Sequence, residues 1–520
     1  MNVYEIIAFA IYFLFVLGVG VYFFFKSKDK GEKDYFLGGR NMGGWVSALS
    51  AGASDMSAWV LMGLPGAIFA SGLNQIWISI GLVIGTILAW IFIAPNLRKY
   101  AIKANDSITV PEFLTNRFKS ASPVLRVACA LVFVAGYLIY AASSVYACGE
   151  LFHKLVPEAS VELGMIIFTI IILVYTLLGG FKAVCWTDFF QGMLMLAALM
   201  IVPIIAGIAV GVNGPSGAGA PNEHFYSMFV YEGDSVSIWG SIANIITGLG
   251  WGLGYFGMPH IIVRYMAIKS KKEMRKSQII GSTWTFLILT MTTILAIVAR
   301  DYLVTTPEKT ELVFAEVVRQ VFGYGALALI GGILISAIVA ASMSTADSQL
   351  LASSSAFASD IYKTVIDKKA DDKKVLNVGR IAVVAVTVLA FGIAFLVVKL
   401  EITNLMGLVS AAWSIFGAAF GPCVILALFW RRFNYKGAVT AIISGFAMSI
   451  LWMILFNLEY YGFESIIFNT AIYELVPGFI VGILVGVIVS LCTKAPSKEV
   501  TDLFDEVKAW KEEDEETAKA

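Results

Sequence analysis

The sequence offers little of what a soluble enzyme or a disulfide-stapled secreted protein requires. Only 14% of its 520 residues are charged, whereas 58% are hydrophobic. Its five cysteines are odd in number and show no CxxC spacing, and its three histidines are widely separated. Neither a disulfide framework nor a metal cluster is indicated. The chain also lacks a G-x-x-x-x-G-K-[ST] phosphate loop and a Ser/His/Asp constellation in its apolar segments, which disfavours an ATP-driven pump and an intramembrane hydrolase.

Long apolar runs recur along the whole chain, and each is typical of a transmembrane helix. We predict about thirteen spans, at residues 4–25, 44–70, 75–97, 124–152, 160–180, 187–211, 236–262, 278–299, 324–354, 378–399, 404–430, 438–457 and 470–492. No connecting loop is long enough to be a folded domain, so residues 1–497 are expected to form one all-α polytopic domain in the plasma membrane. The start, MNVYE, lacks the basic residues of a secretory signal peptide, so we expect the first span to be retained.

The basic residues predict how these spans are oriented. If the N-terminus faces outside, 32 of the 37 Lys and Arg residues lie on one side of the membrane and only five on the other. Cationic loops stay on the cytoplasmic side. We therefore expect an outside N-terminus and a cytoplasmic C-terminus, with residues 498–520 as a short, charged, solvated tail.

Residues 54–57 (Ser-Asp-Met-Ser) place a carboxylate, Asp55, inside one of these spans. No other residue in the run 45–71 is charged. An ionisable residue there costs at least about 2.5–3.5 kcal/mol, and such residues usually mark an ion or substrate path. A helix-packing role, satisfied by neighbouring hydroxyls, is the alternative.

Glycine and proline interrupt the spans 44–70 and 236–262, which lie five helices apart. Two such segments enter the membrane from opposite sides, and a matched pair of broken helices indicates an inverted repeat with a binding site near the midplane. We expect repeats at roughly 44–211 and 236–430. Close helix packing at the small residues is the alternative explanation.

The ninth span carries a face of oxygen atoms. Ala341, Ser344 and Thr345 stand at i, i+3 and i+4, so a carbonyl and two hydroxyls share one side of the helix. The carbonyls of Ala53 and Met56, beside the break in the second span, can add to them. Hard cations prefer such oxygen cages. Hydroxyls in membrane helices also bond back to the preceding turn, but together with the broken, Asp-bearing helix they favour a sodium site.

Aromatic residues gather beside the second break. Trp251 and Tyr255 are one turn apart in the seventh span, and Tyr140 lies in the fourth. Rings with polar edges suit a small amphiphilic solute. Intramembrane aromatics are also common as packing residues and interface anchors, so it is their place beside the break that suggests a solute site.

Three stretches carry a family resemblance: LGGRNMGGWVSALSAGASDMSAWVLMGLPGA at 37–67, GWGLGYFGMPHIIVRYMA at 250–267 and SAIVAASMSTADSQLL at 336–351. Together they resemble the sodium:solute symporter family, most closely its sodium/proline branch. The likeness continues to the KAPS sequence at 494–497 and covers nearly the whole chain.

This resemblance implies a leucine-transporter-like fold of five plus five inverted helices that works by alternating access. It implies sodium as the coupling ion, L-proline as the solute, and neither an organic cofactor nor a nucleic-acid partner. It places sodium on the carbonyls of Ala53, Met56 and Ala341 and on the hydroxyls of Ser344 and Thr345. Asp55 matches the family's sodium-critical acid, which either ligates the ion or supports it electrostatically. The positions implicated in proline binding are Ser57, Trp59, Tyr140, Trp251, Tyr255 and Pro259.

One departure and one further site follow from the same resemblance. Ala58 stands where the proline symporters carry glycine, which bears on solute affinity. Asp188 matches an acid that some relatives use around a second sodium site, and Asp347 and Ser348 would complete such a site.

The sequence therefore predicts a secondary active transporter and not an enzyme. The nearest alternative is a symporter for another solute, such as a different amino acid, a vitamin or a sugar. Proton coupling at Asp55 is a second alternative. A membrane sensor that borrows the fold is a third, although the tail is short for a signalling output domain.

Overall fold

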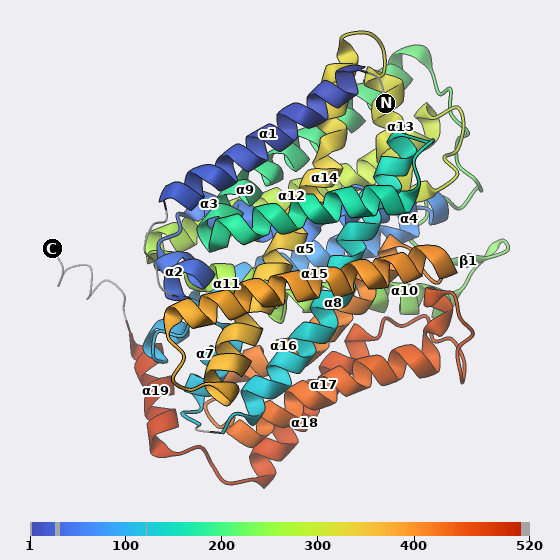
Figure 1. The fold of residues 1–520 in the computed structure, drawn as a ribbon. Coiled ribbons are helices and arrows are strands. Elements are labelled where there is room, and N and C mark those ends of the chain that lie inside the picture. The colour runs from blue at the N-terminus through green and yellow to red at the C-terminus, as the bar shows by residue number, and fades with distance from the viewer. Residues whose placement is uncertain (1–2, 27–31, 121, 511–520) are drawn as a thin grey trace.

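The computed structural model describes residues 3–26, 32–120 and 122–510, and it consists mainly of long helices packed side by side (Figure 1). Within these residues, ten helices are long and apolar enough to cross a membrane, and one bent pair adds an eleventh. The ten lie in α1 (Val3–Lys26), α5 (Ile76–Leu88) with its flanking turns, α8 (Val124–Leu155), the second part of α9 (Val161–Asn213), α12 (Lys271–Tyr302), α14 (Leu327–Ser355), α15 (Asp372–Leu400), α16 (Leu405–Phe429), α17 (Tyr435–Phe456) and α18 (Leu475–Cys492).

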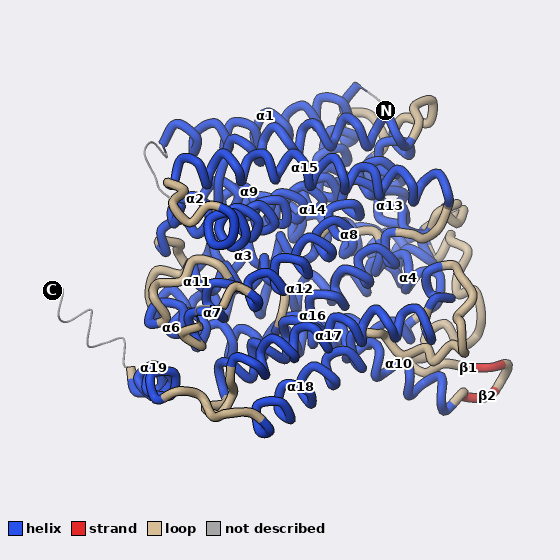
Figure 2. Tube along the Cα trace, turned by 60° about the horizontal axis from the view of Figure 1, so that its bottom comes forward, coloured by secondary structure: helices blue, strands red, loops and turns tan. Residues whose placement is uncertain are grey.

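Shorter elements complete the fold. They are α2 (Glu32–Leu37), η1 (Gly38–Arg40), α3 (Gly44–Met56), η2 (Ala58–Val60), α4 (Gly63–Ser71), η3 (Leu73–Gln75), η4 (Ala89–Ile93), α6 (Ala94–Lys103), α7 (Val110–Arg117), α10 (Ile238–Trp251), η5 (Gly252–Phe256), α11 (Pro259–Ala267), η6 (Thr310–Leu312), α13 (Val313–Phe322), η7 (Ala356–Ile366), η8 (Leu458–Tyr461) and α19 (Lys498–Ala509). Two-residue strands β1 (Tyr231–Glu232) and β2 (Ser235–Val236) pair antiparallel, with Tyr231 opposite Val236. This hairpin and α19 lie at opposite ends of the helix bundle (Figure 2).

The all-α prediction is confirmed, and each of the thirteen predicted spans coincides with helical structure. The number of membrane crossings and their orientation stay predictions. One boundary differs: the spans 160–180 and 187–211 are two helices that meet directly at a kink at Gly180, within the segment labelled α9, where a loop was expected. Gly180 has φ 61° and ψ −179°, a conformation that is essentially restricted to glycine, so a single residue redirects the helix.

Gly180→Ala is expected to destabilise the protein by about 1–3 kcal/mol, because a Cβ makes this backbone conformation strained. The new methyl would also lie about 3.0 Å from the Tyr35 ring. Thermal unfolding of the purified protein followed by tryptophan fluorescence measures the effect. Gly392→Ala, in α15 where a Cβ meets no atom within 4 Å, is the matched control. Equal melting temperatures for the two variants would contradict this role for Gly180.

Both predicted helix breaks are present. In the second span, α3 and the segment η2–α4 are bent by 70° at Ser57. In the seventh, α10 gives way to the 3-10 turn η5 before α11 resumes at Pro259. The two broken segments also meet, because the Met42 amide donates to the Ala267 carbonyl at 3.1 Å and the Lys269 amide donates to the Met42 carbonyl at 3.1 Å.

Close packing explains some of the glycines as well. A Cβ on Gly252 would lie 2.2 Å from the Gly81 carbonyl oxygen, so η5 and α5 approach each other too closely for any side chain. The small residues therefore serve both purposes: some interrupt the helices, and others allow close helix packing. Helix α3 packs against α9, α12, α14 and α11, which surround its broken end with protein. Exposed backbone groups are tolerated at membrane depth only in such surroundings.

Residues 498–509, the first part of the predicted C-terminal tail, are not solvated as the sequence predicts. Residues 498–509 form α19, whose apolar face (Val500, Leu503, Phe504 and Val507) is buried against α6 and its neighbours. The guanidinium of Arg117 lies 5.2 Å from the Phe504 ring centroid. The apolar positions recur at helical spacing among the charges, so packing on one face overrides the charged composition. Residues 511–520 lie outside the described residues.

Phe504→Ala is expected to release α19 from the bundle, because truncating a buried phenylalanine costs about 3–5 kcal/mol. Phe504 is only 2% exposed. Hydrogen exchange of residues 498–510 in the full-length protein measures the release. Glu499→Ala, on the exposed face of α19, should leave exchange unchanged. Wild-type protection in Phe504→Ala would show that the helix is held by other contacts.

Candidate functional site

The break in the second span determines where the polar groups of the site lie. Helix α3 ends at Met56, and Ser57 has φ 44° and ψ −172°. This conformation costs a non-glycine residue about 1–3 kcal/mol and is typical of functional segments. Ser57 Oγ accepts a hydrogen bond from the Trp59 amide at 3.1 Å and so caps η2. The interruption separates the predicted sodium ligand Ala53 from the predicted solute residue Trp59.

Four of the predicted sodium ligands come together where α3 meets α14. The Ser344 hydroxyl donates to the Ala53 carbonyl at 2.9 Å and lies 3.1 Å from the Ala341 carbonyl. The Thr345 hydroxyl lies 3.4 Å from the Ala53 carbonyl. All four residues are fully buried. Uncharged carbonyl and hydroxyl oxygens are the donors that a hard monovalent cation accepts, so the arrangement fits sodium.

The bond from Ser344 back to Ala341 is the preceding-turn contact that was the alternative explanation for these hydroxyls. Both hydroxyls also bond to the Ala53 carbonyl on α3, and a bond back to the preceding turn does not explain these contacts. Met56, the fifth predicted ligand, turns its side chain into the neighbouring cavity. Its carbonyl therefore stays a prediction.

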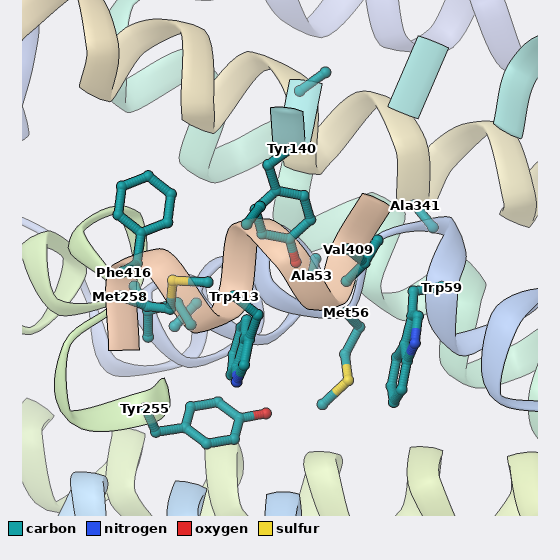
Figure 3. Packing of buried hydrophobic residues seen from close by; sticks show 14 of the residues in the cluster. Ala53, Met56, Trp59, Tyr140, Tyr255, Met258, Ala341, Val409, Trp413 and Phe416 are labelled. Carbon is teal, nitrogen blue, oxygen red and sulfur yellow. The ribbon is translucent and has the colours of Figure 1, made fainter. Parts of the chain in front are cut away.

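That neighbouring cavity contains most of the predicted solute residues. Its lining residues come from α3, η2, α5, α8, α10, η5 and α16, and they are Asp55, Met56, Trp59, Leu82, Tyr140, Trp251, Tyr255, Val409 and Trp413. Figure 3 shows Met56, Trp59, Tyr140, Tyr255 and Trp413 gathered around one region. The cavity measures about 10 Å³, about the space of one water molecule. Side chains must therefore move before an organic solute can enter.

Asp55 joins three of these elements. The Tyr255 hydroxyl donates to Asp55 Oδ2 at 2.5 Å, and the Tyr140 hydroxyl donates to the Asp55 carbonyl at 3.1 Å. The carboxylate thus faces the solute cavity, with its residue only 6% exposed. This geometry favours electrostatic support of the ion over direct ligation in this conformation.

Trp251 separates the solute cavity from a second, larger cavity. Its ring stacks between Trp59 at 5.4 Å and Tyr473 at 5.0 Å, and its carbonyl accepts a hydrogen bond from Trp413 Nε1 at 2.8 Å. The second cavity measures about 410 Å³ and is lined by Trp251, Tyr473 and several polar residues, among them Asn244. It lies at the end of the bundle that the sequence predicts to face outside. Trp251 therefore closes the solute cavity on that side.

The residues of the predicted second cation site lie around an arginine. Arg264 Nη2 is 2.9 Å from Asp188 Oδ2 and 2.5 Å from Ser348 Oγ. The Ser50 hydroxyl donates to the same Asp188 oxygen at 2.6 Å. Asp347 accepts a bond from Ser348 at 3.2 Å through one oxygen. Asp188 already has a positively charged partner. Its role as a cation ligand stays a prediction, because Arg264 would compete with a cation for the carboxylate.

Two predicted solute residues do not line the solute cavity. Ser57 forms the break itself, and Pro259 begins α11 and lines a separate cavity of about 30 Å³ together with Arg264 and Ser348. The other four (Trp59, Tyr140, Trp251 and Tyr255) line the cavity, and their contact with a solute stays a prediction.

Sequence reasoning missed four residues that the structure brings to these sites. They are Leu82, Val409 and Trp413 in the solute cavity and Arg264 beside Asp188. The signal for Arg264 is a single charge within the apolar stretch 259–267, which is typical of a buried pair. Trp413 was one of many intramembrane aromatics, and no local pattern distinguishes it.

Known proteins resemble this chain over nearly its whole length. The sequence model of the Sodium:solute symporter family matches residues 35–445. The high-affinity proline transporter PutP of Bacillus subtilis (strain 168) is 41% identical over 93% of this chain and 98% of its own. The osmoregulated proline transporter OpuE of the same organism is 39% identical, over 97% and 98%. A sodium/proline symporter of Staphylococcus aureus (strain JH9) is 36% identical, over 95% and 94%.

Solved structures of other transporters share the fold. A Na⁺-coupled sialic acid symporter in a substrate-bound outward-open state matches with a TM-score of 0.73 at 20% identity, over 96% of this chain and 99% of its own. MhsT in complex with L-phenylalanine matches with a TM-score of 0.51 at 15% identity, over 86% and 97%. The predicted leucine-transporter-like fold and multi-pass membrane location are thereby confirmed. This chain belongs to the sodium:solute symporter family.

Proposed function

We propose that the protein couples inward sodium movement to L-proline uptake by alternating access. The observation that carries this proposal is that one helix break serves two sites. On one side of Ser57, the Ala53 carbonyl meets the hydroxyl face of α14, and on the other side Trp59 enters the aromatic cavity. The relatives named above that match nearly the whole chain are proline transporters, which supports proline as the solute.

Sodium would act by tying α3 to α14. An ion between the Ala53 and Ala341 carbonyls and the two hydroxyls fixes the end of α3, and with it the positions of Asp55 and Ser57. That ordering lowers the cost of forming the solute site, so each ligand raises the affinity of the other by the same factor. Asp55 supports the ion from the solute cavity and keeps Tyr255 in place.

Proline would occupy the aromatic cavity once Trp59 and Trp251 separate. The faces of these rings suit the apolar pyrrolidine ring. Reforming the Trp59–Trp251 stack would close the cavity toward the large outer cavity.

The sodium gradient is sufficient for concentrative uptake. One positive charge moving inward through 100 mV supplies about 2.3 kcal/mol, and a tenfold sodium ratio adds about 1.4 kcal/mol. With one sodium per proline, these sustain roughly several-hundred-fold accumulation. We place the transporter domain in residues 1–497 and its inverted repeats at 44–211 and 236–430, supported by the two helix breaks, one near the start of each repeat.

Radiolabelled L-proline uptake into proteoliposomes under an inward sodium gradient tests this proposal. Concentrative uptake with sodium, and none under a potassium or proton gradient alone, is the expected result. Uptake driven equally by protons would replace sodium with proton coupling at Asp55.

Another small solute is the second candidate, because this fold also serves a sialic acid symporter. Competition by a panel of amino acids, vitamins and sugars separates the candidates. Sodium-dependent stabilisation without proline transport would keep the cation site and reject proline.

A further inference from the structure

A surface cavity of about 460 Å³ lies apart from the transport site, at the end of the bundle where α19 packs. Its walls come from three segments that are distant in sequence. They are the loop 118–120 after α7, the first residues of α17 (434–436) and the connection 493–500 between α18 and α19. The distribution of basic residues predicts that the cytoplasm is on this side. A cavity of this size falls within the range of small-molecule sites.

Hydrogen bonds join the start of α17 to the wall 493–500 and to residues that follow the loop 118–120. The Asn434 side chain donates to Thr493 Oγ1 at 2.7 Å and to the Lys494 carbonyl at 2.9 Å. The Tyr435 hydroxyl donates to the Ser122 carbonyl at 3.3 Å and accepts from the Leu125 amide at 3.1 Å. These bonds fix the start of α17 against both neighbouring segments, so the cavity is part of the packed structure.

Among the residues that the structure describes, every charged side chain lining this cavity is a lysine. Lys119, Lys436 and Lys494 line it, one from each wall. None of the three ammonium groups forms an ion pair within residues 3–26, 32–120 and 122–510. Lys436 also lies in the first turn of α17, where backbone amides carry partial positive charge. Such a cavity attracts a phosphate group.

Helix α18, which ends just before the cavity residues 493–500, carries an exposed apolar face. Leu484, Ile488 and Leu491 recur at helical spacing along α18, and each is more than half exposed. The face that they form ends close to Lys494, which follows α18 by two residues. A ligand with a phosphate at one end and a hydrocarbon chain at the other matches both features.

We propose that this cavity binds an anionic phospholipid of the cytoplasmic leaflet. The phosphate lies among Lys119, Lys436 and Lys494, and an acyl chain lies along the exposed face of α18. Basic pockets on the cytoplasmic side of transmembrane helices recognise such headgroups. The bound lipid bridges the loop 118–120, α17 and the base of α19, so it also stabilises the contact between α19 and the bundle.

Lipid binding to the full-length protein in detergent, followed by native mass spectrometry, tests this site. Phosphatidylglycerol is titrated against wild type and against Lys119→Gln/Lys436→Gln/Lys494→Gln. We expect about 100-fold weaker binding in this variant, because each lysine near an anionic lipid contributes to affinity. Lys368→Gln/Lys369→Gln/Lys373→Gln removes the same charge from exposed lysines of the η7–α15 region and should bind as wild type does. The corresponding triple arginine variant at the cavity should retain binding.

Three results would overturn the proposal. Equal loss of binding in both glutamine variants would show a general charge effect. Equal binding of phosphatidylcholine would show that the negative charge is irrelevant. Displacement of the lipid by millimolar inorganic phosphate, together with direct phosphate binding, would make this a site for free phosphate. A melting temperature measured in phosphatidylcholine verifies that each variant is folded.

Discussion

Asp55→Asn is expected to raise the sodium concentration that half-saturates proline uptake by about 10–100-fold. Asparagine has the shape of aspartate and still accepts a hydrogen bond from Tyr255, so the change removes the charge and little else. Asp55 is two residues from the predicted ligand Ala53 and almost fully buried, where a carboxylate acts strongly on a nearby cation. Initial uptake rates in proteoliposomes across a sodium series give this value.

Tyr255→Phe is the matched control for that measurement. It keeps the Asp55 charge and the aromatic ring but removes the hydroxyl that bonds to the carboxylate. We expect it to raise the KM for proline more than the sodium requirement. Wild-type sodium dependence in Asp55→Asn, with normal insertion into the membrane, would show that Asp55 does not support the ion.

Arg264→Met is expected to destabilise the protein by about 3–5 kcal/mol, the cost of leaving a buried charge without its partner. Arg264 and Asp188 are 2% and 0% exposed, and their ion pair joins α11 to α9. Methionine keeps an unbranched apolar side chain in the space. Thermal unfolding of the purified protein measures the loss.

The double variant Arg264→Met/Asp188→Asn tests the cause of that loss. If the unpaired carboxylate is responsible, removing its charge should restore most of the stability. Arg431→Met, which removes a solvent-exposed ion pair with Asp505, should change the melting temperature little. A double variant as unstable as Arg264→Met would mean that the arginine acts by packing and not by its charge.

The double variant Arg264→Met/Asp188→Asn also distinguishes two possible roles of Asp188. If Asp188 only balances Arg264, the double variant should keep the wild-type number of sodium ions per proline. If Asp188 also holds a second sodium ion, the double variant should lose one ion from the stoichiometry. Parallel flux measurements of labelled sodium and proline distinguish these outcomes.

The sequence by itself determined the features that depend on local patterns. Apolar runs predicted the helices, because each span must bury its own backbone hydrogen bonds in the membrane. Glycine and proline predicted the breaks in the second and seventh spans. The i, i+3, i+4 spacing of Ala341, Ser344 and Thr345 predicted one oxygen face, because helix geometry alone aligns those positions.

Only the tertiary structure decided which distant side chains meet. Trp413 reaches the solute cavity, Arg264 pairs with Asp188, and α19 packs on the bundle through Phe504. Each contact joins segments far apart in the chain, and helix packing, which no local pattern encodes, brings them together. The charges of residues 498–509 indicated a solvated tail, but burial of one apolar face against a preformed surface favours the docked helix.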